Sequence, residues 1–194
     1  MRVVLYLRNP VDYMRSFLRQ AIKKRGFRGR QSDFVSKSAS RMAYSRLISR
    51  WSSHFPLVLR CYDEVKSDLV VDFLSILGVT VEVHTPRATS VNSTPPDGVT
   101  AAMYLANRWL PAGVARRVRR VVASHARLFA PLKLDDAAII RIAREVPAGW
   151  DMTLLQSWLT QAQMALLLRD TCLDPTLPPE DEKEEALVRG PGRV

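Results

Sequence analysis

The sequence predicts an α/β domain with a small parallel sheet, followed by a helical region. Two short apolar runs rich in β-branched residues, 2–7 and 57–62, each lead into a helical pattern, as buried parallel strands do. From residue 95 onward the apolar residues recur only at helical spacing. The predicted division is an α/β half over 1–94, a helical region of the same domain over 95–177, and a tail over 178–194.

The first strand is predicted over residues 2–7, where RVVLYL ends just before Asn9 and Pro10. Pro10 suits the first position of a helix, and Asn9 suits its N-cap. Apolar residues then recur at helical spacing up to Gly26, which follows three basic residues that favour a helix C-terminus. We expect a strand, a tight turn and a helix, and then a basic loop with the sequence GFRGRQS.

A second helix and a second strand follow. The helix is predicted by an apolar face formed by Tyr44, Leu47, Ile48, Trp51 and Phe55. Residues 57–62, LVLRCY, indicate a second buried strand. The order of strand, helix and strand points to a parallel sheet.

A further helix is expected after Ser67, which can act as its N-cap. Gly78 stands where glycine usually ends a helix, and residues 79–83, VTVEV, are a candidate third strand. The core face of this helix is predicted to consist of Leu69, Val70, Phe73, Leu74 and Leu77.

Four helices are expected in the helical region. The first two are indicated by apolar residues at helical spacing over 99–109 and 114–129. The third follows Asp135, which can cap it, and the fourth is indicated over 154–166. The tail over 178–194 is expected to be disordered, because it has little apolar surface to bury.

The formal net charge of +10 raises the question of an anionic partner. Only six of the 29 basic residues are lysines, and arginine's planar fork suits phosphate and sulfate groups. Coding bias alone also raises arginine content, so charge by itself does not settle the partner. Two cysteines, Cys61 and Cys172, and three scattered histidines argue against a disulfide framework and against a metal site. The sequence has no apolar run long enough for a membrane span or a signal peptide, and we expect a cytoplasmic protein.

Arg8 stands at the carboxyl end of the first predicted strand, where ligands bind in parallel α/β sheets. The helix that follows offers backbone N–H groups and the positive end of its dipole. At about 100° per residue, Ser16 projects roughly opposite Met14, so its hydroxyl need not lie in the core. An arginine fork, a hydroxyl and a helix N-terminus together describe a phosphate pocket. The alternatives are an ion pair of Arg8 with Asp12 or Asp63, and a solvated Ser16.

These residues resemble a known family. RNPVDYMRS, residues 8–16, looks like the 3′-phosphate-binding motif of sulfotransferases, which has an arginine and a serine at this interval. Residues 44–79 are similar to a pattern of bacterial sulfotransferases. That pattern consists of a helix with Tyr and Trp, a strand ending near Tyr-(Asp/Glu) and a helix with the sequence DFL..LG. Residues 91–108, VNSTPPDGVTAAMYLANR, resemble an Asn-x-Ser-type segment of some carbohydrate sulfotransferase-like proteins. The resemblance covers about residues 2–110.

The resemblance implies an architecture related to P-loop nucleoside kinases. It also implies transfer of a sulfuryl group from 3′-phosphoadenosine 5′-phosphosulfate (PAPS) to a hydroxyl of a carbohydrate or small acceptor, with no metal ion. Arg8 and Ser16 would hold the 3′-phosphate, and Asn92 and Ser93 would contact the nucleotide. The acidic pair after LVLRCY would order loops near the site, although it can equally cap the next turn.

Two parts of the family pattern are not found in residues 1–194. No stretch resembles the loop that grips the 5′-phosphosulfate, since GFRGR and GPGRV do not lie between a strand and a helix. No catalytic base is evident, and His54, His84 and His125 are better explained as surface or structural histidines. We therefore expect the C-terminal part of a sulfotransferase-like protein, in which the activity is an open question.

A second class of function competes with this one. A non-catalytic anion-binding or partner-interaction module would account for the charge, and ARRVRRVV carries four arginines on one helix. Nucleic acid is the less favoured partner because no aromatic residues alternate with these arginines to stack on bases. A solvated basic face is the default explanation of this cluster.

Overall fold

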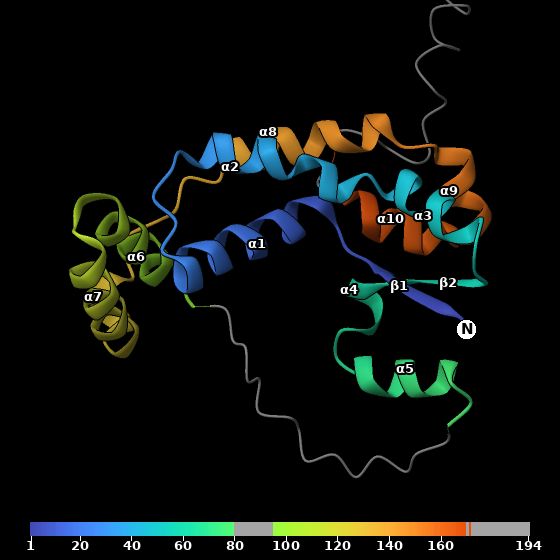
Figure 1. Cartoon of the computed structure of the whole chain (residues 1–194), viewed down its shortest axis with the longest axis horizontal. Helices are drawn as coiled ribbons and strands as arrows, with labels where there is room; N and C mark the ends of the chain where they lie inside the picture. The colour runs from blue at the N-terminus through green and yellow to red at the C-terminus, as the bar shows by residue number, and fades with distance from the viewer. Residues whose placement is uncertain (80–94, 170, 172–194) are drawn as a thin grey trace, which may run out of the picture.

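The computed structural model describes residues 1–79, 95–169 and 171. This part of the chain is mainly helical, and it contains a small two-stranded parallel sheet flanked by helices (Figure 1). The prediction of a small parallel sheet flanked by helices and followed by a helical region is confirmed at this level.

The sheet consists of β1 (Val3–Leu7) and β2 (Leu57–Cys61), close to the two predicted strands. Their register pairs Val3 with Leu57 and Leu7 with Cys61. Because the strands are parallel, their carboxyl ends lie side by side, and the residues that follow them meet at one edge of the sheet.

Helix α1 (Pro10–Arg25) follows β1 directly and has both predicted ends. The Asn9 side chain accepts hydrogen bonds from the first turn, and Gly26 has the left-handed φ of 64° that ends the helix. Its core face consists of Pro10, Val11, Met14, Leu18, Ala21 and Ile22. Pro10 supplies the helical φ at the first position, where its missing N–H costs nothing.

Four helical segments follow α1 before residue 67, and β2 lies between the third and the fourth of them. They are α2 (Gln31–Ser38), the 3-10 helix η1 (Ala39–Met42), α3 (Tyr44–Ser52) and the short α4 (Tyr62–Val65). The basic loop is shorter than predicted, because the chain is helical again from Gln31. Helix α3 confirms the second predicted helix.

Helix α5 (Leu69–Ile76) differs from the prediction in two ways. Asp68 occupies the N-cap position, and the Ser67 hydroxyl donates to the Asp68 carboxylate instead of capping the helix. The predicted core face is largely open, with Val70 62% and Leu77 57% exposed. Periodicity shows which residues share a face, but burial also needs a neighbouring element to cover that face. Gly78 has the expected positive φ of 73°, while residues 80–83 of the candidate third strand lie outside the described residues.

The helical region begins with α6 (Asp97–Trp109) and α7 (Ala112–Ser124), which pack against each other (Figure 1). The 3-10 helix η2 (Ala126–Phe129) follows α7, so the single helix predicted over 114–129 is interrupted at His125.

Next come α8 (Ala137–Glu145), the 3-10 helix η3 (Val146–Gly149), α9 (Met152–Trp158) and α10 (Gln161–Leu168). Asp136, not the predicted Asp135, occupies the N-cap position of α8, while the Asp135 carboxylate accepts a hydrogen bond from the Ala137 N–H at 3.0 Å. The helix predicted over 154–166 is two helices, because Thr160 and Gln163 form a capping box that starts α10.

The hydrophobic core draws on both halves of the chain. Met14 and Leu18 of α1 belong to the same buried cluster as Ile139 of α8 and Leu167 of α10. Figure 1 shows α8 running alongside α2, and both helices pack against α1. Burial of these side chains packs α1 against α8, and α1 also packs against α2 and α6. Within the described residues, no helix is both long enough and apolar enough to span a bilayer.

Candidate anion-binding site

Arg8 follows β1 at the carboxyl edge of the sheet. Its guanidinium carbon lies over the ring of Tyr62, 5.1 Å from the ring centroid. Its backbone carbonyl accepts a hydrogen bond from the Tyr44 hydroxyl at 2.7 Å. Its Nε is buried and has no hydrogen-bond partner within the described part of the chain. The side chain is therefore held against an aromatic ring while a buried N–H donor stays unsatisfied, which is costly without a ligand.

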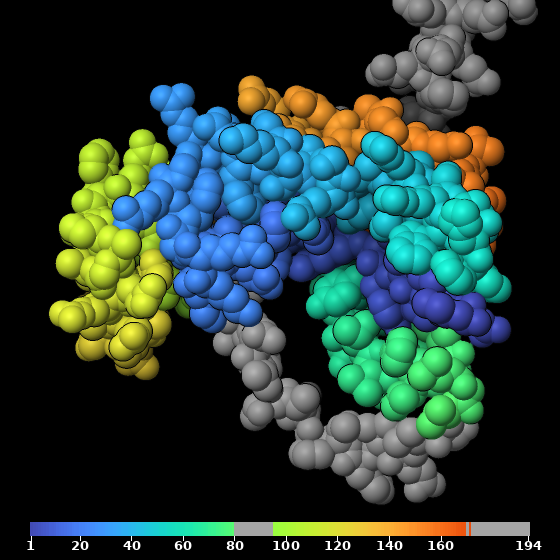
Figure 2. All heavy atoms as spheres, viewed as in Figure 1, coloured from blue at the N-terminus to red at the C-terminus, as the bar shows by residue number. Residues whose placement is uncertain are grey.

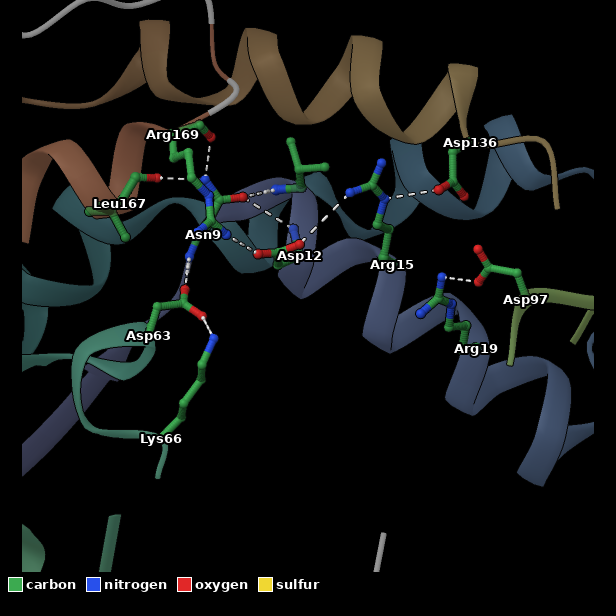
Figure 3. A network of polar contacts seen from close by, with 11 residues as sticks. Asn9, Asp12, Arg15, Arg19, Asp63, Lys66, Asp97, Asp136, Leu167 and Arg169 are labelled. Carbon is green, nitrogen blue, oxygen red and sulfur yellow. Dashed lines mark hydrogen bonds and ion pairs between the residues drawn. The ribbon is translucent and has the colours of Figure 1, made fainter. Parts of the chain in front are cut away.

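The two carboxylates that could neutralise Arg8 are engaged elsewhere (Figure 3). Asp12 pairs with Arg169 at 2.7 Å and with Arg15 at 3.8 Å. Asp63 pairs with Lys66 at 3.4 Å. Among the described residues no ion pair includes Arg8, so the alternative of an Arg8 ion pair with Asp12 or Asp63 does not describe this structure.

The N-terminus of α1 does not offer free N–H groups. The Val11 and Asp12 N–H groups donate to Asn9 Oδ1 at 3.0 and 3.2 Å, and the Tyr13 N–H donates to the Asn9 carbonyl at 2.8 Å. Pro10 has no N–H. The prediction that this terminus contributes backbone donors is wrong, because its own N-cap satisfies them. Any anion bound here relies on side chains and on the helix dipole.

Asn9 has a second role that sequence reasoning missed. Its Nδ2 donates to the carbonyls of Leu167, at 3.1 Å, and Arg169, at the end of α10. Its own N–H donates to Asp63 Oδ2 at 3.4 Å. The completely buried Asn9 therefore joins the β1–α1 turn to α4 and α10. The only sequence signal was the N-cap position before Pro10.

Ser16 lies on α1 two turns after its start, half-buried and on the side of the helix away from Met14, as predicted. No side-chain hydrogen bond involves Ser16 in the part of the chain that the structure describes. The neighbouring Phe17 ring packs on the Phe34 ring, with the two ring centroids 5.1 Å apart. The guanidinium carbon of Arg41 lies over the Phe17 ring, 4.8 Å from its centroid. Seven residues of helix place Ser16 about 10 Å along the axis from Asn9. Within the described residues, no hydrogen bond joins Ser16 to Arg8 directly.

The acidic pair Asp63 and Glu64 connects α4 to its neighbours. Asp63 accepts from Asn9, as described above, and its side chain is only 2% exposed. Glu64 Oε2 accepts a hydrogen bond from Gln163 Nε2 of α10 at 2.7 Å. These contacts agree with the expected ordering of loops beside the strand ends more closely than with capping of the next turn.

Other candidates are placed less favourably. Asn92, Ser93 and His84 lie outside the described residues. His54 and His125 are exposed at the ends of α3 and α7, as expected for surface histidines. The described residues contain no cluster of His, Cys, Asp and Glu that could hold a metal ion.

Burial sets the protonation of the polar groups near the strand ends. Burial raises the pKa of Tyr44, so its hydroxyl remains a donor to the Arg8 carbonyl. Burial also raises the pKa of Cys61, which ends β2. At neutral pH neither group is an anion that would compete for the Arg8 guanidinium.

The surface is hollowed between α1 and the α4–α5 segment (Figure 2). In Figure 1 both strands run toward this side, so their carboxyl ends face the hollow. The fold and the site define a mainly helical protein with a parallel strand pair and a cationic side chain at its carboxyl edge. No family model matches the sequence, and no curated protein and no solved structure matches it either.

Proposed function

We propose that this protein is a sulfotransferase-like protein that binds the 3′-phosphate of PAPS through Arg8 and Ser16. One observation carries the proposal: Arg8 ends a parallel strand with a buried Nε that lacks a partner among the described residues. The motif RNPVDYMRS, which resembles the sulfotransferase 3′-phosphate motif, supplies the identity of the anion.

The contacts of Arg8 suit a phosphate. The Tyr62 ring covers one face of the guanidinium, so the planar edge with its N–H donors is what remains for a ligand. Phosphate oxygens accept such donors in pairs. Because Asp12 and Asp63 are bound to other cations, no carboxylate has to be displaced from Arg8.

Ser16 supplies a second donor further along the same helix. Its hydroxyl has no side-chain hydrogen bond within the described residues and lies off the buried face of α1. We propose that the phosphate lies between the strand end and the second turn of α1, where the Arg8 guanidinium and the Ser16 hydroxyl both donate to it. The phosphate is then held by two side chains, without the backbone donors of the helix terminus.

The reaction proposed for the intact site is an in-line sulfuryl transfer. The acceptor hydroxyl oxygen forms a bond to the sulfur of PAPS, the bond from sulfur to the bridging phosphate oxygen breaks, and 3′-phosphoadenosine 5′-phosphate leaves. A base takes the hydroxyl proton. The acceptor class that we propose is a carbohydrate or a small hydroxylated molecule.

Nucleotide binding is the direct test, because residues 1–194 contain no stretch like the 5′-phosphosulfate loop. Calorimetric titration with 3′-phosphoadenosine 5′-phosphate should show binding, and AMP, which lacks the 3′-phosphate, should bind much more weakly. Arg8→Ala should weaken binding by about tenfold or more, since a charge-assisted hydrogen bond contributes about 1.5 to 3 kcal/mol. Ser16→Ala should have a smaller effect.

The matched control is Arg46→Ala, which removes an exposed arginine from α3 and should leave binding unchanged. ADP tests the position of the second phosphate, since it carries two phosphates but none on the 3′ oxygen. Equal affinity for ADP and the 3′-phosphorylated nucleotide, insensitive to Arg8→Ala, would contradict the proposal and favour a general anion-binding module.

A further inference from the structure

Helices α6 and α7 and the 3-10 helix η2 carry large apolar side chains that project into solvent. Trp109 is 74% exposed, Leu128 is 73% exposed and Val121 is 59% exposed. We call this set the hairpin surface, and it consists of Leu105, Trp109, Val114, Val121 and Leu128. Exposed apolar groups gathered on consecutive elements mark an interaction site more often than scattered ones do.

The same segment is strongly basic. Residues 97–129 contain six arginines and one acidic residue, Asp97, which forms an ion pair with Arg19 of α1. Arg108, Arg116, Arg117, Arg120 and Arg127 are exposed. The Arg108 guanidinium lies over the Trp109 ring at 5.7 Å from its centroid, so positive charge and the most exposed aromatic side chain occur together.

Helices α6 and α7, which we call the hairpin, are attached to α1 by a buried polar contact. Asn107 is fully buried, and its Nδ2 donates to the Ile22 carbonyl near the end of α1 at 3.0 Å. Arg119 donates to Asn107 Oδ1. The exposed apolar residues therefore belong to a fixed element, and they are not the open face of a frayed helix.

The hairpin also lies at the end of the molecule away from the sheet (Figure 1). Figure 2 shows the space-filled α6–α7 segment forming that end of the molecule, beyond α1 and α2. A flat partner can approach this end without meeting the strand ends or the hollow beside them.

The combination of side chains favours one kind of partner. Arginines alone would suit the phosphates of a nucleic acid, but the exposed Val114, Val121 and Leu128 would gain nothing from a phosphate backbone. At a bilayer surface, aliphatic side chains and tryptophan enter the boundary between head groups and acyl chains, and arginines contact lipid phosphates. Charge complementarity requires that these lipids be anionic.

We propose that α6, α7 and η2 dock this protein onto an anionic phospholipid surface. The hairpin surface inserts its apolar side chains shallowly into the interface, and the surrounding arginines bind the negatively charged head groups. This docking is independent of the nucleotide site, which lies at the carboxyl edge of the sheet.

The test is flotation of the full chain with vesicles of phosphatidylcholine alone or with added phosphatidylglycerol. The protein should float only with the phosphatidylglycerol vesicles, and binding should weaken as salt rises. Arg116→Glu with Arg117→Glu should reduce the affinity by at least about tenfold, because each basic side chain near an anionic surface contributes to binding. Arg46→Glu with Arg50→Glu changes the net charge equally on α3 and should have little effect.

The apolar contribution is tested separately. Trp109→Ser with Leu128→Ser should also reduce flotation, while Trp158→Ser, which replaces a 38% exposed tryptophan on α9, should not. Equal unfolding midpoints for all variants, measured by circular dichroism, show that each of them is folded.

Four outcomes would overturn the proposal. These are equal binding to neutral vesicles, equal losses from the two charge-reversal pairs, and binding to duplex or single-stranded nucleic acid without flotation. The fourth is self-association in sedimentation that Trp109→Ser with Leu128→Ser abolishes while vesicles remain unbound, which would assign the hairpin surface to a second copy of this chain.

Discussion

The Tyr6 hydroxyl of β1 donates to Asp72 Oδ2 of α5 at 2.8 Å. Asp72 Oδ1 lies 3.3 Å from Nε of Arg60 on β2. Tyr6 and Arg60 are register partners in the sheet, so one carboxylate joins both strands to α5. This contact matters because a two-stranded sheet is only marginally stable without support from a packed helix.

The Tyr6 contact predicts a pH dependence of stability. Burial, and then the hydrogen bond to Asp72, raises the pKa of Tyr6 to about 12, above its ordinary value of 10.0. A raised pKa means that this stabilisation is complete below about pH 10 and is lost as the pH rises through 12. Urea unfolding from pH 8 upward should show a smaller alkaline loss for Tyr6→Phe than for the wild type. An identical alkaline loss in both proteins would contradict this assignment.

Asp72 itself should be important for stability. Asp72→Asn removes a charged acceptor from Tyr6 and Arg60, and we expect the free energy of unfolding to fall by about 2 kcal/mol. The matched control, Asp33→Asn on the exposed side of α2, should change it by less than about 0.5 kcal/mol. Chemical denaturation at neutral pH measures both, and equal effects would show that Asp72 does not join the strands to α5.

Substitutions of Asn9 separate its two roles, which are capping α1 through Oδ1 and joining α1 to the end of α10 through Nδ2. Asn9→Ala removes the N-cap of α1 and the Nδ2 hydrogen bonds to the carbonyls of Leu167 and Arg169, which should cost roughly 3 kcal/mol. Asn9→Asp keeps the capping oxygen but loses the Nδ2 donor, and it places a carboxylate beside those carbonyls and near Asp63. If Asn9→Asp were as stable as the wild type in urea unfolding, the contact with α10 would contribute nothing.

Gly98 in the first turn of α6 is required by close packing. A Cβ at this position would lie 1.8 Å from the Phe129 carbonyl oxygen, which is backbone and cannot swing aside. Gly98→Ala should destabilise the protein by about 2 kcal/mol or more. Gly113→Ala in α7 meets no atom within 4 Å and should be neutral or stabilising by up to about 1 kcal/mol. Thermal unfolding compares the two, and equal stabilities would mean that η2 does not pack on α6 at this point.

Cys61 should react slowly as a thiol. It is 1% exposed, and burial raises its pKa, so little thiolate is present and little of the sulfur is accessible at pH 8. In a Cys172→Ser background, Ellman's reagent should modify Cys61 slowly in the native protein and fast in urea. Rapid reaction of the native thiol would show that the end of β2 opens readily.

Local features of this fold could be predicted from sequence because their causes lie within a few residues. The β1–α1 unit has an apolar run, an Asn-Pro start and a glycine end, and each acts through backbone geometry alone. The capping box at Thr160 was equally readable from Thr160 and Gln163, yet the apolar pattern on both sides suggested one continuous helix. Local signals that compete within one segment must be weighed against each other, and here the cap prevails over the periodicity.

The candidate site was predictable only in part. Arg8 at the strand end and the outward position of Ser16 follow from strand and helix geometry. That the α1 terminus is satisfied by Asn9, and that Asp12 and Asp63 are bound by Arg169 and Lys66, depends on residues brought together from distant parts of the chain. Nothing in the local pattern encodes those partners.

The sequence by itself determined the two strands, the ends of α1, the position of Arg8 and the basic character of α7, because composition and short-range backbone preference decide such features. Only the tertiary structure decided that Asn9 joins α1 to α10, that Asp72 holds both strands and that no described element covers the apolar residues of α5 or the hairpin surface. The physical reason is that burial and pairing are properties of two surfaces in contact, and a periodic pattern describes only one of them.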